Sequence, residues 1–311
     1  MQKVKRYDLI IIGAGPAGLS AALTARAEGI ESLLVLDRLP APGGILSQCL
    51  HRGFGTRELS GMEFAEELMA RAARAGIEVR QNASVSALLP DGTATVFGGG
   101  AVYQIRGRAV ILASGARERP AGHLPIVGTR PAGVFTAGSV QKMLNLCGYH
   151  VGHRAVILGS GDVGVIVAHH LRQSGAAVLG VFEQADAPSC LPRNKRLYID
   201  AHSIPLVTGC TVTRLHGTGR LSAVTLCDVD GDGRPLDASA RILRCDTLVT
   251  SVGLIPEREL SGGLKNAEGK LPPWLFPCGN AERIFSLIEP VMDSGREAGR
   301  MAAAYLRACH K

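Results

Sequence analysis

The sequence predicts an α/β fold of two similar domains, with the second inserted into the first. Three observations support this prediction. A strand, a glycine-rich turn, a helix and a second strand occur in that order at residues 8–37 and again at 154–183, which is the order of a βαβ unit. Two apolar segments, 110–115 and 248–253, flank the second copy and mark the expected crossings between domains. A chain of 311 residues is long enough for about two domains.

Three elements build the first copy. An apolar run that ends in glycines predicts a buried parallel strand, a helix-forming stretch ends at Gly29 as a C-cap, and a second apolar run ends at Asp37. In chain order these are strand 8–12, helix 17–28 and strand 32–36. Residues 62–74 then predict an amphipathic helix, followed by short strands that turn at 91–92 and 98–100.

The second copy repeats this order, and short strands and a last helix follow it. The expected elements are strand 154–158, helix 162–174, strand 177–182, strands 206–215, 221–229 and 241–249, and helix 289–308. The last helix contains small residues that allow close packing. We therefore expect a first domain built from 1–117 and 251–311, and a second domain at 118–250.

Each copy carries the same glycine motif directly after its first strand, GAGPAG at 13–18 and GSGDVG at 159–164. In G-x-G-x-x-G the first glycine makes a tight turn, the second lets the backbone approach a pyrophosphate, and the third lets helix and strand pack closely. The N–H groups at the start of the helix then receive the phosphate charge. An acid stands 19 positions after each last glycine, Asp37 and Glu183, where it can accept a hydrogen bond from a ribose hydroxyl. Both domains are therefore predicted to be Rossmann-like and dinucleotide-binding.

Two dinucleotide sites in one chain suggest hydride transfer between a nicotinamide and a flavin. The late segment LFPCGN at 275–280 supplies the second contact that an FAD site needs, because Gly279 allows close approach and Asn280 can reach the ribityl or phosphate groups. The helix after it would point its N-terminus at the flavin and stabilise negative charge there. We therefore assign FAD to the first motif and NAD to the second.

The second acid also predicts which nicotinamide dinucleotide binds. Glu183 would repel a 2′-phosphate, and the next basic residue along the chain is Arg193. NAD is therefore expected rather than NADP.

The composition argues against several other classes of protein. Aromatic residues make up 4%, and the net charge of +7 comes from scattered residues, so no nucleic-acid partner is expected. The eight cysteines contain no C-x-x-C, which predicts free thiols in a reducing cytoplasm. The uncharged run 9–25 is interrupted by glycine and proline and is too short to span a membrane. A cytoplasmic location without an integral membrane segment is therefore expected.

The segment 42–55, PGGILSQCLHRGFG, places a thiol two residues from an imidazole, Cys49 and His51. A metal site would need further ligands at fixed spacing, and none is near, so no metal is expected. A Cys–His nucleophile or a redox or proton-transfer role stays open. On an extended segment the two side chains would share one face, which also suits the wall of a pocket.

Together these motifs resemble the two-dinucleotide flavoproteins typified by thioredoxin reductase. DLIIIGAGPAGLSAA, the Gly43-Gly44 pair, VILASG, GSGDVG, TSVGLIPE and LFPCGN occur in the expected order over essentially the whole chain. Two departures matter. Thioredoxin reductases carry a C-x-x-C before the second motif, whereas residues 133–148 hold one thiol, Cys147, which cannot form a dithiol relay alone. Asn280 stands where the wider family usually has Asp.

VFTAGSVQKMLN looks like a narrower group, the FAD/NAD-type α subunits of amine and opine oxidases, hydrogen cyanide synthase and sarcosine oxidase. PGGILSQCLHRGFG, ELSG and LVTSVGLIPERELS look closer still to the flavoprotein that often accompanies an anaerobic-type glycerol-3-phosphate dehydrogenase and a small cysteine-rich iron–sulfur protein. This resemblance implies an electron-transfer subunit of a heteromeric complex. A partner flavoprotein would oxidise a small substrate, and this chain would pass electrons between that partner and NAD. The resemblance also implies that the segment after Gly44 runs along the flavin ring.

Flavin lining is therefore the favoured role of Cys49 and His51. Two alternatives to the electron-transfer subunit stay open: a stand-alone NADH-dependent reductase or oxidase with a diffusible acceptor, and a largely structural subunit that binds FAD and NAD. The candidate FAD residues are Gly13, Gly15, Pro16, Ala17, Gly18, Asp37, Arg38, Gly43, Gly44, Gln48, Cys49, Ser114, Gly115, Gly279 and Asn280. The candidate NAD residues are Gly159, Gly161, Asp162, Val163, Gly164, Glu183 and Gly253.

Overall fold

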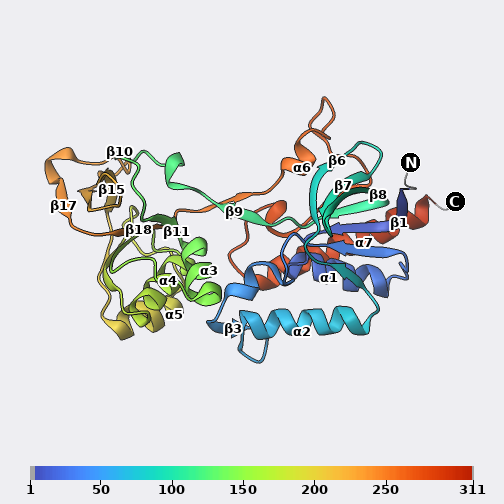
Figure 1. Cartoon of the computed structure of the whole chain (residues 1–311), viewed down its shortest axis with the longest axis horizontal. Helices are drawn as coiled ribbons and strands as arrows, with labels where there is room; N and C mark the ends of the chain where they lie inside the picture. Colours follow the sequence, from blue (N-terminus) through green and yellow to red (C-terminus); the bar gives the residue numbers. More distant parts are fainter. Residues whose placement is uncertain (1–3, 310–311) are drawn as a thin grey trace. The chain divides into compact units, whose positions relative to one another are not determined.

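The computed structural model describes residues 4–309, which form two compact units (Figure 1). The first unit comprises Met1–Arg117 and Ile255–Lys311, and the second comprises Glu118–Leu254. The sequence places the second boundary at 251. Where the chain passes between the units, β9 (Ala116–Glu118) and β19 (Leu254–Pro256) pair in a two-stranded sheet. The second unit is thus an insertion into the first.

A seven-stranded sheet forms the centre of the first unit, in the order β5-β2-β1-β8-β7-β6 with β20 also beside β8. Its strands are β1 (Lys5–Ile12), β2 (Leu33–Leu36), β5 (Glu78–Arg80), β6 (Ser84–Leu88), β7 (Thr93–Gly98), β8 (Ala101–Leu112) and β20 (Leu275–Pro277). The first half of β8 pairs with β7 in antiparallel fashion, and its last three residues pair with β20 in parallel. Strands β5, β2, β1 and β8 pair with one another in parallel, so the glycine motif follows a central parallel strand.

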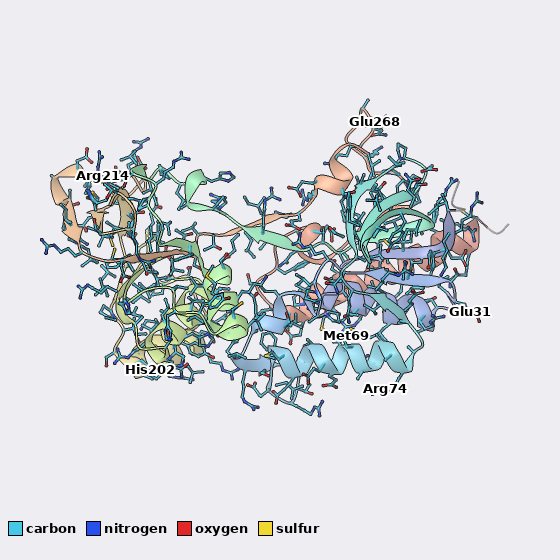
Figure 2. All side chains as sticks on the ribbon, in the orientation of Figure 1. Glu31, Met69, Arg74, His202, Arg214 and Glu268 are labelled. Carbon is cyan, nitrogen blue, oxygen red and sulfur yellow. The ribbon has the colours of Figure 1, made fainter. Side chains whose placement is uncertain are left out.

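The two faces of this sheet bury alternate residues of β1. Leu9 and Ile11 pack under the helices, and Ile10 and Ile12 pack on the opposite face with β6, β7 and the segment before β20. The helices are α1 (Pro16–Ala27), α2 (Gly61–Arg74), α6 (Glu259–Gly262) and α7 (Ile288–Ala308). The α2 helix begins with a capping box made by Ser60 and the residue three positions later. It ends with arginines, Arg74 among them, whose charge favours a helix C-terminus (Figure 2).

The last helix packs closely on the first. A Cβ added to Gly295 would lie 2.1 Å from the carbonyl oxygen of Ala17, and one added to Gly299 would lie 2.6 Å from that of Ala21. Only glycine lets the two backbones approach this closely. The expected close packing of the last helix is therefore confirmed, and α7 supports the helix that follows the first glycine motif.

The second unit combines two sheets. A five-stranded parallel sheet has the order β11-β18-β12-β13-β14, and a four-stranded sheet has the order β10-β15-β16-β17. The strands are β10 (Val127–Gly128), β11 (Val134–Thr136), β12 (Arg154–Leu158), β13 (Ala177–Phe182), β14 (Leu206–Val207), β15 (Cys210–His216), β16 (Ala223–Asp228), β17 (Arg241–Leu243) and β18 (Thr247–Thr250). The helices are α3 (Ala137–Cys147), α4 (Asp162–Gln173) and α5 (Pro192–Asn194). One apolar cluster lies between the parallel sheet and its helices, and another joins the two sheets.

Two expected strands proved to be wrong, because each is divided between the two sheets. The segment 206–215 contains β14 and β15, which separate at Gly209, where φ is +68°. The segment 241–249 contains β17 and β18, which separate before Asp246, whose carboxylate accepts hydrogen bonds from the backbone N–H groups of His153 and Arg154. Apolar residues resume just after the short breaks at 208–209 and 244–246, so the hydrophobic pattern does not reveal the change of sheet.

Within residues 4–309, the structure contains no helix with the length and apolar character needed to cross a membrane.

Candidate functional site

Both glycine motifs are packed in nearly the same way. A Cβ on Gly13 would lie 2.2 Å from the backbone oxygen of the residue after β8, and a Cβ on Gly159 would lie 2.2 Å from that of the residue after β18. The third glycines lie against the first, because a Cβ on Gly18 or Gly164 would be 1.9 or 2.5 Å from the backbone oxygen of its own motif's first glycine. Protein packing alone therefore requires glycine at these four positions.

The middle glycine of each motif, unlike the first and the third, is not packed tightly against other protein atoms. A Cβ on Gly15 would meet nothing nearer than 3.8 Å, and one on Gly161 nothing nearer than 3.9 Å, within the residues described. Their φ angles of −79° and −60° suit any L-residue. Helices α1 and α4 begin directly after them, so free N–H groups lie at the same place. The open space above these glycines fits a pyrophosphate that approaches the backbone.

The two acids are oriented by matching hydrogen bonds. Asp37 is buried, with its side chain accepting from the backbone N–H of Ala14 at 2.6 Å and of Leu39 at 2.8 Å. Glu183 accepts from the backbone N–H of Ser160 at 2.9 Å and of Ala185 at 3.1 Å. In each unit one donor is the second residue of the motif and the other lies two positions after the acid, so both carboxylates are held beside their motif.

The carboxylate of Glu183 has further donors, the hydroxyls of Ser160 and Ser189. Burial opposes its charge, but the hydrogen bonds from Ser160, Ala185 and Ser189 outweigh burial and hold the pKa of Glu183 below its ordinary value. This carboxylate is therefore ionised at neutral pH. Sequence reasoning did not find either serine, because Ser160 occupies a variable position of the motif and Ser189 is 29 positions away from it.

Three segments distant in the sequence meet at the first motif. The N–H of Gly43 donates to the Ala14 carbonyl at 2.8 Å, and a Cβ on Gly44 would lie 3.0 Å from the Cα of Gly15. A Cβ on Gly279 would lie 2.7 Å from the Cβ of Ala17. Asp37 lies at the same place through its bond to the motif. The structure therefore gathers most of the predicted FAD residues around the start of α1.

Arg38, Ser114 and Gly115 are connected through one acidic residue, Glu257. The Ser114 hydroxyl donates to the Glu257 carbonyl oxygen at 2.6 Å, the Glu257 N–H donates to the carbonyl of Gly115 at 3.0 Å, and Arg38 forms an ion pair with the Glu257 carboxylate at 3.3 Å. These contacts fix the end of β8. Sequence reasoning missed Glu257, since its bonds are to residues more than a hundred positions away.

A short turn connects Gly279 to the last helix. The element that begins there is a 3₁₀ helix, η6 (Gly279–Ala281), and α7 starts only at Ile288. The Asn280 side chain accepts from the N–H of Phe285 at 3.0 Å and so closes the intervening turn. The Gly279 N–H donates to the hydroxyl of Ser294 in α7 at 3.0 Å. The helix expected at 289–308 is confirmed as α7, one residue longer at its start.

Cys49 directly follows a 3₁₀ helix, η1 (Gly44–Gln48), and its own backbone is extended, with φ of −91° and ψ of 98°. Its side chain is 7% exposed and its Sγ lies 3.2 Å from the Ile45 carbonyl oxygen. A Cβ on Gly61, the first residue of α2, would be 2.5 Å from the Cβ of Cys49. Burial raises the pKa of the Cys49 thiol to about 12. A protonated thiol packed against α2 argues against a nucleophile.

Gln48 and His51 flank this buried thiol. Gln48 is also buried. The His51 ring contacts the Phe54 ring in a tilted arrangement, with the ring centroids 5.1 Å apart and the planes at 48°. Their roles toward a flavin stay predictions.

The remaining residues predicted for NAD lie around the start of α4. One carboxylate oxygen of Asp162 accepts from the Leu191 N–H and from the Asn194 side chain, both at 2.8 Å. Val163 is exposed, and Gly253, with φ of +104°, follows the end of β18. The residues described contain no group of three or more His, Cys, Asp or Glu that could hold a metal ion.

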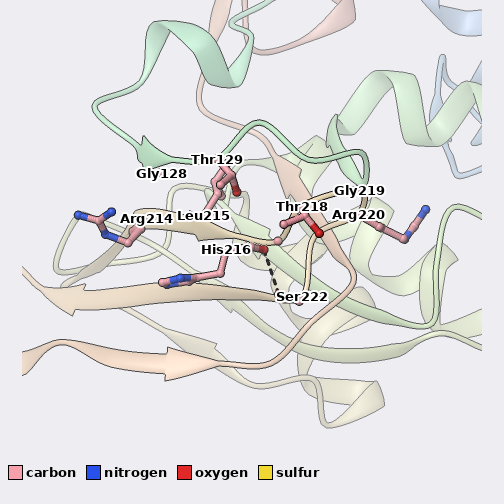
Figure 3. Close-up of a pocket in the computed structure, with 10 residues that line it drawn as sticks. Gly128, Thr129, Arg214, Leu215, His216, Thr218, Gly219, Arg220 and Ser222 are labelled. Carbon is pink, nitrogen blue, oxygen red and sulfur yellow. Dashed lines mark hydrogen bonds between the residues drawn. The ribbon is translucent and has the colours of Figure 1, made fainter.

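A cavity of about 680 Å³ lies elsewhere in the second unit, on the four-stranded sheet (Figure 3). It is lined by residues 128–129 and by the end of β15 with the turn that follows it. The Arg220 side chain in its wall donates to the Val151 carbonyl and to the Thr247 hydroxyl. That arginine is engaged in holding the fold, and the cavity is separate from the glycine motif.

Comparisons with known proteins agree with this geometry. A family model described as pyridine nucleotide-disulphide oxidoreductase matches residues 7–273. An opine oxidase subunit of Rhizobium meliloti is 28% identical over 94% of this chain and 57% of its own length. Hydrogen cyanide synthase subunit HcnB of Pseudomonas protegens is 28% identical over 81% of this chain and 57% of its own length. The chain thus spans little more than half the length of these curated relatives.

Solved structures share the fold. The thioredoxin reductase of T. acidophilum superposes with a TM-score of 0.76, at 20% identity, over 97% of this chain and 99% of its own. That of Lactococcus lactis superposes with a TM-score of 0.75 at 18% identity. The predicted fold class, two Rossmann-like α/β domains, is therefore confirmed.

Proposed function

The chain belongs to the pyridine nucleotide-disulphide oxidoreductase family and is an FAD-dependent oxidoreductase, and on this premise we propose that it is the electron-transfer subunit of a larger dehydrogenase or oxidase. In this role a partner flavoprotein oxidises a small substrate, and the chain passes electrons between that partner and NAD. A small cysteine-rich iron–sulfur protein would be a further partner. The observation that supports this role is the absence of a dithiol where thioredoxin reductases carry one.

The region in which thioredoxin reductases carry that dithiol, residues 133–148, contains β11 and α3 in this chain. The first residues of α3 are Ala137, Gly138 and Ser139. The Gly138 N–H donates to the Glu118 carboxylate at 2.8 Å, and a Cβ at this position would lie 2.8 Å from the same carboxylate. Glu118 thus occupies the space that a side chain at Gly138 would need. Cys147 stands alone at the other end of the helix, so electrons need an acceptor other than a protein disulfide.

Buried thiols elsewhere do not supply a substitute. Burial raises the pKa of Cys278 to about 12, as it does for Cys49, and thiols of that pKa are poor nucleophiles at neutral pH. The names of the curated relatives agree with a partner-dependent role, since the opine oxidase and hydrogen cyanide synthase relatives are both named as subunits.

We assign FAD to the first unit and NAD to the second. Around the first motif, Asp37, the Gly43-Gly44 turn and Gly279 come together from three distant parts of the chain. Such an enclosed site suits a resident cofactor. The second motif has Glu183 and one neighbouring segment, which suits a cofactor that must bind and leave in each turnover.

The residues of the two sites have defined tasks in this proposal. When bound, FAD and NAD(H) supply the redox chemistry, the exchange of a hydride between nicotinamide and flavin. Gly15 and Gly161 leave room for the pyrophosphates, and the first N–H groups of α1 and α4 receive their charge. Asp37 and Glu183 accept hydrogen bonds from ribose hydroxyls.

Anaerobic stopped-flow measurements on the purified, FAD-loaded chain test the proposal. We expect NADH to bleach the flavin absorbance rapidly, and multiple turnovers with the artificial acceptor ferricyanide. We expect slow turnover with dioxygen and with the disulfide 5,5′-dithiobis(2-nitrobenzoate). Fast turnover with either of these two would instead indicate a stand-alone oxidase or reductase. A flavin that NADH does not bleach would indicate a structural subunit.

A further inference from the structure

We infer that Ser160 and Ser189 are specificity-determining residues of the second dinucleotide site. They hold Glu183 so that one carboxylate oxygen, Oε1, is left for the adenosine ribose, and this arrangement selects NAD(H) over the 2′-phosphorylated dinucleotide. The inference rests on the proposed assignment of NAD to the second unit. The two serines act through Glu183 and are therefore positioning residues.

The two oxygens of Glu183 are used very differently. Oε2 accepts from the N–H of Ser160 at 2.9 Å, from its hydroxyl at 2.5 Å and from the hydroxyl of Ser189 at 3.1 Å. A carboxylate oxygen has about two lone-pair directions, so Oε2 is saturated. Oε1 accepts from the N–H of Ala185 at 3.1 Å, its single donor within residues 4–309. Oε1 is therefore the oxygen that can accept a ribose hydroxyl.

The serines also fix one another. The Ser189 N–H donates to the Ser160 hydroxyl oxygen at 2.9 Å, and the two hydroxyl oxygens are 3.2 Å apart. Because that N–H occupies an acceptor position of the Ser160 hydroxyl, the hydroxyl proton is directed to Glu183. Ser160 is fully buried, so water does not compete for these bonds. The result is a closed network that fixes the rotamer of Glu183 before a ligand arrives.

The segment that carries Ser189, residues 189–194, is here termed the strap. It is tied a second time through Asp162, which accepts from the Leu191 N–H and the Asn194 side chain. Ser160 and Asp162 are the neighbours of Gly161 on either side, so the strap is held at both flanks of the middle glycine. Arg193 lies between its two anchor residues Leu191 and Asn194 and is therefore closer to the motif than its position in the sequence suggests.

The charge of Glu183 governs the choice between the two dinucleotides. A basic residue near the ribose would favour a 2′-phosphate, whereas an ionised carboxylate repels it. The hydrogen bonds that lower the pKa of Glu183 keep the repulsion in place across neutral pH. Without the two hydroxyls, the carboxylate would lose both its fixed orientation and part of the stabilisation of its charge.

The first unit shows what the site would be without the serines. Ala14 stands where the second motif has Ser160, and Asp37 takes one backbone donor on each oxygen. Each oxygen of Asp37 therefore retains acceptor capacity. The alanine also demonstrates that this turn tolerates the loss of the hydroxyl, so a Ser160→Ala variant is expected to fold.

The test is the equilibrium binding of NAD⁺ and NADP⁺ to the full-length, FAD-loaded protein, measured by isothermal titration calorimetry. We expect Ser160→Ala together with Ser189→Ala to lower the preference for NAD⁺ over NADP⁺ by roughly tenfold, chiefly through weaker NAD⁺ binding. Ser189→Thr keeps the hydroxyl and should retain most of the preference for NAD⁺ over NADP⁺. Ser222→Ala is the matched control, because its hydroxyl donates to the His216 carbonyl on the other sheet (Figure 3), and it should change nothing.

The pH dependence of NAD⁺ binding is a second readout. In the wild-type protein, binding should persist as pH falls until the lowered pKa of Glu183 is reached. Removal of the two hydroxyls raises that pKa, so the double variant should lose affinity at a higher pH.

Glu183→Gln separates failure of the inference from failure of the assignment. If this variant loses the preference while the double serine variant keeps the wild-type preference and pH profile, the serines have no role in specificity and the inference is overturned. If Glu183→Gln itself leaves NAD⁺ affinity and preference unchanged, NAD does not bind at this carboxylate, and the assignment of the second unit is wrong as well.

Discussion

At its glycine motif the first unit brings together Asp37 and two further segments, whereas the second unit brings together Glu183 and one further segment, the strap. At the first motif, the Gly43-Gly44 turn lies against the backbone of Ala14 and Gly15, and Gly279 lies against the Cβ of Ala17. At the second, the strap reaches the motif through side chains, those of Ser160 and Asp162. Contacts that involve the backbone leave a site little freedom to open, whereas hydrogen bonds to side chains can break and re-form one at a time. This difference supports our proposal that the first unit retains its cofactor and that the second exchanges one.

The largest expected effect is on stability. It concerns the first glycine of the motif, which is packed in the same way in both units. Gly13→Ala places a Cβ 2.2 Å from a backbone oxygen at a φ of +109°, so we expect the first unit to lose about 3 kcal/mol or more of unfolding free energy. Gly29→Ala is the control, since its φ is +89° but its Cβ would enter open space, and it should cost about 1 kcal/mol. Chemical denaturation of the protein without added cofactor measures both. Equal losses would contradict the close contact.

The second-largest expected effect is on cofactor binding, and it should differ between the two glycine motifs. Gly15→Ala and Gly161→Ala meet no protein atom within 3.4 Å, so both variants should fold. Gly15→Ala should purify with little FAD, whereas Gly161→Ala should keep FAD but need roughly a hundredfold more NADH for flavin reduction, about 2.7 kcal/mol of binding. Flavin content and anaerobic NADH titration provide the measurements. Loss of FAD from Gly161→Ala would reverse the assignment of the two units.

The smallest expected effect concerns Cys49 and His51. Because Cys49 is a buried, protonated thiol, we expect Cys49→Ser and His51→Ala to retain FAD. Their rates of flavin reduction by NADH should lie within about tenfold of wild type, a barrier change of ~1.4 kcal/mol or less. Stopped-flow traces at saturating NADH measure these rates. A thousandfold loss of the rate of flavin reduction in either variant would instead show that the residue is catalytic and that a protein side chain of the first unit takes part in the reaction.

The sequence predicts the elements that a local pattern defines. Both βαβ units lie within a few residues of their expected bounds, because the glycine motif marks the end of a strand and the start of a helix together. The strands at 206–215 and 241–249 were joined wrongly, since an apolar run carries no signal for the sheet in which a strand pairs.

The parts of the site that escaped prediction depend on contacts between distant residues. Ser189 has no motif of its own, and Glu257 ends the segment TSVGLIPE without any local sign of its role, so both are recognisable only once folding brings them to Ser160 and Gly115. The burial of Cys49 has the same origin, because it results from the packing of α2 against the end of η1. Local spacing suggested a reactive pair there, and the tertiary structure places the thiol in the interior.

The interruption of the first unit by the second has a consequence for biosynthesis. The second unit is continuous in the chain, so a ribosome delivers all its strands before the first unit has received β20 and α7. Domains generally fold as units during synthesis, and the nascent first unit must keep the apolar face of α1 uncovered until Gly295 and Gly299 emerge. Gly279, which completes the proposed FAD site, is made just before them. Loading with FAD is therefore expected to be a late, largely post-translational event.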